Sequence, residues 1–529
     1  MAQIGGEAAA KRRNPSSSGE DRLSTLPDDI LVLILLRLDT ISEAARTSVL
    51  SLRWRRIWTL LPKLAFNFAP DYHHIRKVLA ASEAPALHRI FVNTKDDAPD
   101  SVAAWLPLAA RRLSGFLVYR NVVEGQGDDE EEEEEEDGAI ALPCFGNATR
   151  ICLDLGFLAL SLPPSGVFTR LSELYLKRVR VQGQCELGDV VSSRRCPSLR
   201  KLGIFGTRGV ARLAIQSESL LTITLQHLDG LQQLRIDALA LKELRLRYCF
   251  VGNQPVANIS APQLVFLKWR DAYDPISVQL VNLGKLQRLS SYFVLGDSQR
   301  YDVHNRGVLK LLYRFEVIHR LHIALEYRKA SSHPLLCKMC NFQYFMEDIR
   351  VLLNVTFLTM TVTNGTHTFG ACLFQVLRLC AGIRRFSLSL CTSTDLEAES
   401  SCPTGCICDE ATNWKTEEFS LNGLQEVEIT GLRGAEHEVV FLKQLFNWAV
   451  VLEKMRVTFD YSISQSKAKE LCHKLSSFSK PETYMQFYMY QNCDRKSVRL
   501  LSLEDEGTGV SVPQSILVCL LPSIIQTLP

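Results

Sequence analysis

Cysteines and histidines are the side chains in this sequence whose spacing comes nearest to a metal site. Two groups of closely spaced cysteines occur, namely Cys337 and Cys340 with His333 nearby, and Cys402, Cys406 and Cys408 with Cys391 upstream. Structural zinc needs four soft ligands that converge tetrahedrally, and neither group alone has a familiar zinc spacing. We therefore expect unliganded loop cysteines, with no bound metal and no other cofactor.

The sequence also lacks the short motifs that organise common catalytic sites. It contains no glycine-rich phosphate loop, nucleophile elbow, zinc-protease helix or paired kinase motifs. The eleven histidines are dispersed. His319 and His322 fall within a strand-like phrase, where one buried and one surface residue is the ordinary arrangement. We expect no catalytic residues and a chain that is not an enzyme.

Length and charge restrict the class of protein further. A chain of 529 residues is too long for one compact core, which indicates several domains or an elongated repeat array. Ten acidic residues form one block, Asp128–Asp137; without it 60 basic and 48 acidic side chains remain, a net charge of +12. That bias is too weak to predict nucleic-acid binding. The block repels itself, which predicts a solvated loop, with binding of a basic partner as the alternative.

The cellular compartment is predicted from two stretches that resemble neither a secretory signal nor a membrane span, and from the cysteines. Residues 1–20 are polar and lack the apolar core of a secretory signal. The most apolar stretch, Ile516 to Ile525, is short and interrupted by Pro522. Sixteen cysteines are scattered singly, which is typical of reduced thiols. We expect a cytosolic or nuclear protein, or both, without a membrane partner.

Residues 21 to 68 contain the capping and start signals of three short helices. The first begins near Pro27 with Thr25 as its cap, the second spans Ser42 to Leu50 with Ser42 as its cap, and the third spans Leu52 to Leu60. From Ile30 to Leu38 every residue but Arg37 is apolar. So small a unit cannot bury this surface internally, so the surplus faces either the rest of the chain or a separate partner.

The amino-acid sequence of this stretch resembles the plant F-box motif. The resemblance rests on Leu26-Pro27-Asp28-Asp29-Ile30-Leu31, on residues 44–51 and on residues 53–58. It implies binding to the Skp-type adaptor of SCF ubiquitin ligases and, through that adaptor, to a cullin. The implied adaptor contacts are Leu26, Pro27, Ile30, Leu52, Trp54 and Trp58, although one of the two tryptophans has the size and type of a core residue.

From about Ile151 the phrase apolar-x-x-apolar-x-apolar recurs. Clear copies begin at Leu171, Leu199, Leu220, Leu241 and Leu264, and looser copies continue to about residue 460. Such spacing is typical of leucine-rich repeats, in which each unit supplies one strand and a return segment. Short returns predict an outer strand at Leu231 to Ile236, and a longer one predicts a helix at Val439 to Leu445.

A second resemblance lies near the C-terminus. Residues 423–431, 436–441 and 451–455 resemble the FBD segment of plant F-box/leucine-rich-repeat proteins. The expected fold is α+β: a small three-helix F-box, then an irregular leucine-rich-repeat solenoid with a parallel sheet on its concave side. The expected divisions are a disordered tail (1–20), the F-box (21–68), a linker and early solenoid containing the acidic loop (69–138), the repeats (139–414), FBD-like closing repeats (415–460) and a tail of undetermined structure (461–529).

The concave face is where repeat proteins usually bind partners, through the positions between buried leucines. In the regular repeats the predicted target-binding residues are Lys242, Arg245, Arg247, Phe266, Lys268 and Arg270. Their excess of cations indicates an acidic or phosphorylated protein target. The alternative is a charged strand face that is merely soluble.

The expected function is therefore that of a substrate-recognition adaptor of an SCF-type ubiquitin ligase, itself without catalytic activity. A rival from another class is an interaction scaffold that has the same domains but does not support ubiquitination. An unrecognised enzyme is a third reading, and the sequence offers no catalytic constellation for it.

Overall fold

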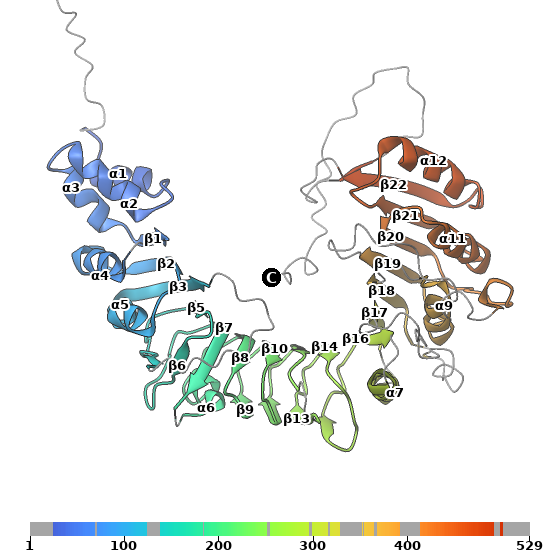
Figure 1. Cartoon of the computed structure of the whole chain (residues 1–529), viewed down its shortest axis with the longest axis horizontal. Helices are drawn as coiled ribbons and strands as arrows, with labels where there is room; N and C mark the ends of the chain where they lie inside the picture. Colours follow the sequence, from blue (N-terminus) through green and yellow to red (C-terminus); the bar gives the residue numbers. More distant parts are fainter. Residues whose placement is uncertain are drawn as a thin grey trace, which may run out of the picture.

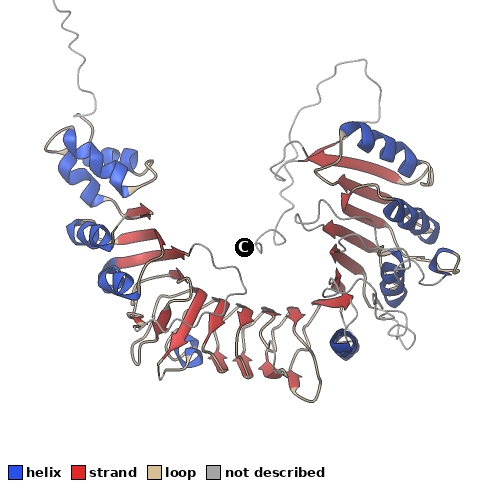
Figure 2. Ribbon diagram, viewed as in Figure 1, coloured by secondary structure: helices blue, strands red, loops and turns tan. Residues whose placement is uncertain are grey.

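The structure is a computed structural model that describes residues 25–68, 71–123, 138–183, 185–250, 254–295, 299–315, 318–327, 352, 354–363, 368–391, 413–490 and 498–500. Apart from Cys391, the two cysteine groups lie outside these residues, as do the acidic block and the N-terminal tail. The described chain forms an open arc, with strands along its inner side and mostly helices along its outer side (Figures 1 and 2).

The arc begins with the small helical unit that the sequence predicts. Its elements are α1 (Asp28–Leu35), α2 (Ile41–Arg46), the 3-10 turn η1 (Thr47–Val49), α3 (Trp54–Ile57) and the 3-10 turn η2 (Trp58–Leu60). Leu31 and Leu35, one helical turn apart on α1, are buried. Three helices are confirmed, although the second and third each end in a 3-10 turn.

Both predicted caps are wrong. Pro27 itself is the N-cap of α1, which has no side-chain cap hydrogen bond, and the carbonyl of Pro27 accepts from the amide of Ile30 at 3.1 Å. In α2 the cap is Thr40, two residues before the predicted Ser42. The amide of Glu43 donates to Thr40 Oγ1 at 3.3 Å, and the Glu43 carboxylate accepts from the Thr40 amide at 3.3 Å. The capping box therefore fixes the start of α2, because it satisfies two terminal amides at once.

One parallel sheet runs the length of the arc, each strand pairing with the next along it. Its strands are β1 (Lys63–Asn67), β2 (Leu87–Lys95), β3 (Leu113–Val122), β5 (Arg150–Asp154), β7 (Glu173–Gln182), β8 (Lys201–Arg208), β10 (Thr222–Leu228), β12 (Glu243–Arg247), β14 (Phe266–Arg270), β16 (Arg288–Leu295), β17 (Arg320–Tyr327), β18 (Phe357–Thr363), β19 (Arg385–Cys391), β20 (Glu426–Leu432), β21 (Lys454–Phe459) and β22 (Tyr484–Tyr490). The short strands β4 (Ile140–Ala141) and β6 (Ala159–Ser161) join beside β7, and β23 (Val498–Leu500) pairs antiparallel with β22.

The leucines of the repeat phrase form the core of the arc. In β12, Leu244 and Leu246 are fully buried, while Glu243, Arg245 and Arg247 alternate with them on the other face. The same alternation recurs in β14 and, in a shared register, along most of the sheet. The concave face is therefore made of the variable positions between buried residues, as the sequence predicts.

The outer layer changes with the length of the return segments. Helices cover both ends of the arc: α4 (Tyr72–Ala81), α5 (Pro99–Arg112), α6 (Leu187–Val191), α7 (Gln299–Arg314), α9 (Gly370–Leu379), α11 (Glu436–Trp448) and α12 (Gln465–Ser476), with the 3-10 turn η4 (Asn413–Lys415). In the middle, where repeats are about 22 residues long, a second parallel sheet replaces them, comprising β9 (Arg212–Ser217), β11 (Gln233–Ala238), β13 (Val256–Ser260) and β15 (Val278–Val281). The predicted outer strand is confirmed as β11, and the helix predicted in a longer return segment is confirmed as α11.

The parallel sheet is longer than the sequence phrases indicate. It begins at β1, inside the range predicted for the F-box, and it continues past residue 460 through α12 and β22. The described part of the predicted tail therefore adds one more helix and strand to the solenoid, together with the short antiparallel strand β23. No helix within the described ranges combines the length and apolar character that crossing a membrane requires.

Candidate functional site

Exposed apolar side chains gather on the helical unit, on α1 and in the segment between α1 and α3. On α1, Ile30, Leu33 and Ile34 are 40%, 58% and 41% exposed, and their spacing places them on the helix face opposite Leu31 and Leu35. We define the F-box patch as these three residues together with the exposed residues Leu38, Val49, Leu50 and Leu52. A helix that is apolar on both faces needs a partner on each, and within the described chain α1 has a partner on only one.

The predicted adaptor contacts divide between this patch and the core. Ile30 and Leu52 belong to the patch, with Leu52 77% exposed, and Pro27 is exposed beside it. Leu26 and Trp58 are half-buried and pack against the core. Trp54 is only 6% exposed, so its prediction as a surface contact is wrong. Trp54 is therefore the core tryptophan, a choice between Trp54 and Trp58 that the sequence left open.

One ion pair holds the two ends of this unit together. Arg53 Nε donates to Asp28 Oδ1 at 2.8 Å, and the guanidinium also donates to the carbonyl of Leu26. Because Leu52 directly precedes Arg53, the pair brings the segment before α3 close to the start of α1. The sequence missed Leu33, Ile34, Leu38, Val49 and Leu50, although the apolar run from Ile30 to Leu38, interrupted only by Arg37, was the signal for the first three.

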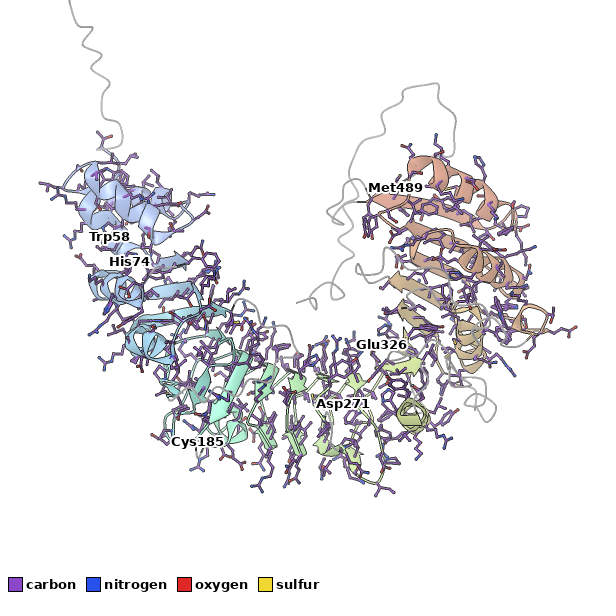
Figure 3. All side chains as sticks on the ribbon, in the orientation of Figure 1. Trp58, His74, Cys185, Asp271, Glu326 and Met489 are labelled. Atoms are coloured by element: carbon purple, nitrogen blue, oxygen red, sulfur yellow. The ribbon has the colours of Figure 1, made fainter. Side chains whose placement is uncertain are left out.

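A second candidate surface lies halfway along the concave sheet, well apart from the F-box (Figure 3, where Trp58 and Glu326 mark the two places). Strand register places Arg245 beside Lys268 and Arg247 beside Arg270. Arg288, from the next strand, lies beside Phe266. We define the basic cluster as Arg245, Arg247, Lys268, Arg270 and Arg288.

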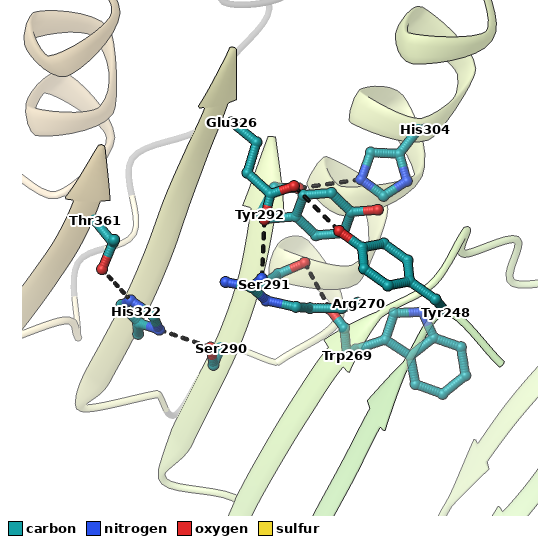
Figure 4. A network of polar contacts seen from close by, with 10 residues as sticks. All are labelled: Tyr248, Trp269, Arg270, Ser290, Ser291, Tyr292, His304, His322, Glu326 and Thr361. Carbon is teal, nitrogen blue, oxygen red and sulfur yellow. Dashed lines mark hydrogen bonds and ion pairs between the residues drawn. The ribbon is translucent and has the colours of Figure 1, made fainter. Parts of the chain in front are cut away.

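Two carboxylates neutralise part of this charge. Glu243 lies 2.8 Å from an Arg245 nitrogen and 3.3 Å from an Arg288 nitrogen. Arg270 Nη1 lies 2.9 Å from Glu326 Oε1, and the hydroxyl of Tyr248 donates to Glu326 Oε2 at 3.1 Å (Figure 4). Glu326 comes from β17, so this contact reaches across β16. Arg247 and Lys268 receive no carboxylate within the described part of the chain.

Two titratable side chains, one in the cluster and one beside it, have lowered pKa values. Burial, followed by the charges of Arg270, Arg247 and Arg245, lowers the pKa of Lys268 to about 8. Burial, followed by Arg270 and Lys268, lowers the pKa of His322 to about 4. His322 is therefore neutral at physiological pH, and Lys268 is protonated but easily deprotonated.

Aromatic rings lie against the guanidinium groups of the cluster. The guanidinium carbons of Arg245 and Arg288 lie 5.1 and 5.0 Å from the ring centre of Phe266. Arg270 lies 5.4 Å from the ring of Tyr292, and Arg247 lies 5.1 Å from the ring of Tyr248. Such contacts fix the planes of the guanidinium groups and thereby orient their donors.

An unusual backbone conformation positions the ring of Tyr248 among these aromatic side chains. Its φ of 52° is left-handed, as are the φ values of 45°, 57° and 50° at Arg178, Gly206 and His227, the corresponding positions of three preceding repeats. Three of these four residues are not glycine, so in each of those three repeats the conformation costs about 1–2 kcal/mol. The repeated turn directs the Tyr248 hydroxyl toward Glu326 (Figure 4).

A serine–histidine pair beside the cluster has no catalytic geometry. His322 Nδ1 lies 2.8 Å from Ser290 Oγ, and His322 Nε2 lies 3.0 Å from Thr361 Oγ1. Ser290 is buried, and both imidazole nitrogens are engaged by hydroxyls. The neutral ring joins β16, β17 and β18 as a structural link. His319, three residues earlier, is exposed and His322 is partly buried, so the predicted pairing of one buried and one surface residue holds only in part.

The predicted target-binding residues are brought together with one exception. Arg245, Arg247, Phe266, Lys268 and Arg270 share the concave face. Lys242 does not, because it precedes β12 and its carbonyl accepts from the amides of residues 265 and 266. Sequence reasoning missed Glu326, Tyr248, Tyr292 and Arg288, since three of these lie in other repeats and Tyr248 follows its strand. Among described residues, no group of histidines, cysteines and carboxylates is arranged to bind a metal.

Comparison with known proteins assigns both parts of the fold. A family model described as "F-box domain" matches residues 23–65. A second, described as "FBD-associated F-box protein At5g56370, LRR repeats", matches residues 134–275. The chain therefore combines an F-box domain with leucine-rich repeats, and families of this kind are typically non-catalytic adaptors.

Relatives in Arabidopsis thaliana show the same combination. "F-box/FBD/LRR-repeat protein At2g04230" is 30% identical over 234 residues, which cover 40% of this chain and 49% of that protein. "Putative F-box/FBD/LRR-repeat protein At4g03220" is 28% identical over 288 residues, which cover 52% and 56%. The chain spans about half the length of the curated relatives it matches. These findings confirm the resemblance to plant F-box/leucine-rich-repeat proteins with an FBD segment.

Proposed function

We propose that this protein is the substrate receptor of an SCF-type ubiquitin ligase. Its F-box patch binds a Skp-type adaptor, the adaptor binds a cullin, and the concave sheet binds the protein to be ubiquitinated. The site of action is the cytosol, the nucleus or both.

The observation that carries this proposal is the second apolar face of α1. Leu31 and Leu35 already fill the core of the helical unit, so Ile30, Leu33 and Ile34 are surplus to its folding. A cluster of seven apolar side chains on so small a unit is typical of a docking surface. The match of an F-box model to residues 23–65 supports a Skp-type adaptor as the occupant.

The mechanism is proximity rather than chemistry within this chain. One end of the arc is tied to the ligase and the middle holds the target, so transfer of ubiquitin becomes effectively intramolecular. The distance between the F-box patch and the basic cluster leaves room for other subunits to supply the reactive groups. The concave cations favour an acidic or phosphorylated target segment.

Affinity purification from plant cells tests the proposal against the scaffold alternative. The tagged chain and a Leu33→Asp/Ile34→Asp variant are compared under proteasome inhibition, with Ile276→Asp, an exposed apolar residue elsewhere, as the control. The proposal predicts that cullin and ubiquitin conjugates accompany the wild type and the control, and that the patch variant loses both. Adaptor without cullin and without conjugates on the wild type would instead favour the scaffold.

A further inference from the structure

The basic cluster contains more positive charge than its carboxylates neutralise. Its five cations face two carboxylates, Glu243 and Glu326, which leaves an excess of three positive charges. Glu243 is shared by Arg245 and Arg288, and Glu326 is committed to Arg270. The two members with no carboxylate partner in the described chain are Arg247 and Lys268.

These two residues are close enough to bind one small ligand. Arg247 pairs in register with Arg270, two residues along β14 from Lys268. Standard strand spacing and rise then put the Cα atoms of Arg247 and Lys268 about 8 Å apart, within reach of two long side chains that converge on one group. Both side chains project from the same face of the sheet.

Donors at this place are buried without partners. The Nε atoms of Arg247 and Arg270 are shielded from solvent and have no hydrogen-bond acceptor. Buried donors of this kind cost about 1–3 kcal/mol each when left unsatisfied. The Arg270 guanidinium is already held by Glu326 and by the ring of Tyr292, and Arg247 lies against Tyr248. The groups are therefore oriented before any ligand binds.

We infer that Arg247 and Lys268 bind a doubly charged tetrahedral anion, namely the phosphate monoester of a phosphorylated side chain on the target. The inference rests on the proposed function, which places a target on this face. A phosphate monoester carries close to two negative charges at neutral pH and matches the two unpaired cations, whereas one carboxylate would leave one of them unmatched.

The protonation of Lys268 gives this inference a separate readout. In the free protein, burial and the charges of Arg270, Arg247 and Arg245 hold the pKa of Lys268 near 8. The remaining group that acts on it is Glu326, and His322, which also faces the cluster, is neutral. An anion bound beside Lys268 reverses the repulsion, so the ammonium should take up a proton when the anion binds at pH 8.5.

Calorimetry on the full chain with sulfate measures that uptake, because sulfate is a tetrahedral dianion that does not itself titrate at this pH. Titrations at pH 8.5 in two buffers of different ionisation enthalpy should show uptake of about 0.7 of a proton per anion, if the Lys268 pKa returns toward its ordinary value. Lys268→Met should abolish the uptake, and Arg247→Gln should weaken sulfate binding at least tenfold. Arg385→Gln is the matched control, since Arg385 is a concave cation already paired with Glu426 at 2.9 Å.

A mixture of peptides with random residues around phosphoserine then identifies the source of the phosphate. The wild type and Arg385→Gln should retain these peptides at least tenfold better than their serine counterparts, and the two cluster variants should not. Equal retention of both mixtures, or sulfate binding no stronger than acetate binding, would overturn the inference. Melting temperatures and binding of a purified Skp-type adaptor are measured for every variant. Intact adaptor binding with no anion binding rejects only this inference, whereas anion binding with no adaptor binding rejects the ligase function.

Discussion

Arg270 Nη1 lies 2.9 Å from Glu326 Oε1, and this contact joins β14 to β17 across the ring of Tyr292 on the intervening strand (Figure 4). The two side chains are only 11% and 16% exposed. Their attraction is therefore little screened, and removing one partner leaves the other buried and unpaired. The pair holds Arg270 in place within the basic cluster, where the outer layer changes from strands back to helices.

A double-mutant cycle tests this pair. Arg270→Met alone and Glu326→Met alone should each lower the free energy of unfolding by about 3 kcal/mol, because each leaves a buried charge without its partner. The double variant should lose clearly less than the sum of the two. Chemical denaturation monitored by circular dichroism provides the values. Strict additivity would show that the two charges do not interact.

The two tryptophans of the helical unit should behave differently. Trp54→Ala removes a buried side chain and should destabilise the unit by about 3–5 kcal/mol. Trp58→Ala removes a half-buried side chain and should cost less. Hydrogen exchange of residues 28–60, followed by mass spectrometry, reports both effects. If Trp54→Ala left the exchange of this unit unchanged, the placement of that side chain in the core would be wrong.

Stability should depend on pH through Lys268. Its folded pKa of about 8 lies below the ordinary value of 10.5, so between these two pH values the unfolded chain binds more protons than the folded one. This residue's contribution to stability therefore rises with pH across that window. Below pH 8 the lysine is charged in both states and its full cost is present. Lys268→Met should raise the melting temperature at pH 7, and its advantage over the wild type should shrink toward pH 10.5.

Removal of the acidic block should leave the fold unchanged. Asp128–Asp137 is a self-repelling run that cannot contribute to a core, so deleting it should shift the melting temperature by no more than a few degrees. Differential scanning calorimetry of the deletion variant checks this expectation. A loss of many degrees would show that the block supports the solenoid.

The repeated apolar pattern predicted most of the fold because each copy depends only on residues that are close together in the sequence. Each copy, such as the one containing Leu244 and Leu246, reports its own strand and the direction of its side chains. The early solenoid was predicted only as the range 69–138, and its individual strands could not be placed for the opposite reason. Strands β2 and β3 are 9 and 10 residues long and are separated by helix α5, which has a proline within it, so their phrases are not evenly spaced.

The candidate sites were predictable only in part. Arg245 and Lys268 could be placed on one face because strand alternation is set by the sequence. Glu326 could not, since its contact with Arg270 depends on the register between repeats 56 residues apart. Trp54 and Trp58 illustrate another limit, because composition identifies an apolar surplus in a small helical unit without saying which residues form the core.

The central claim is tested most directly by the affinity of the full chain for a purified Skp-type adaptor. Isothermal titration should show tight binding by the wild type and at least a tenfold loss in Leu33→Asp/Ile34→Asp, because a central apolar anchor typically contributes about 2 kcal/mol or more. Arg247→Gln, far along the arc, should bind the adaptor like the wild type. Undiminished adaptor binding by the patch variant, or no binding by the folded wild type, would contradict the account.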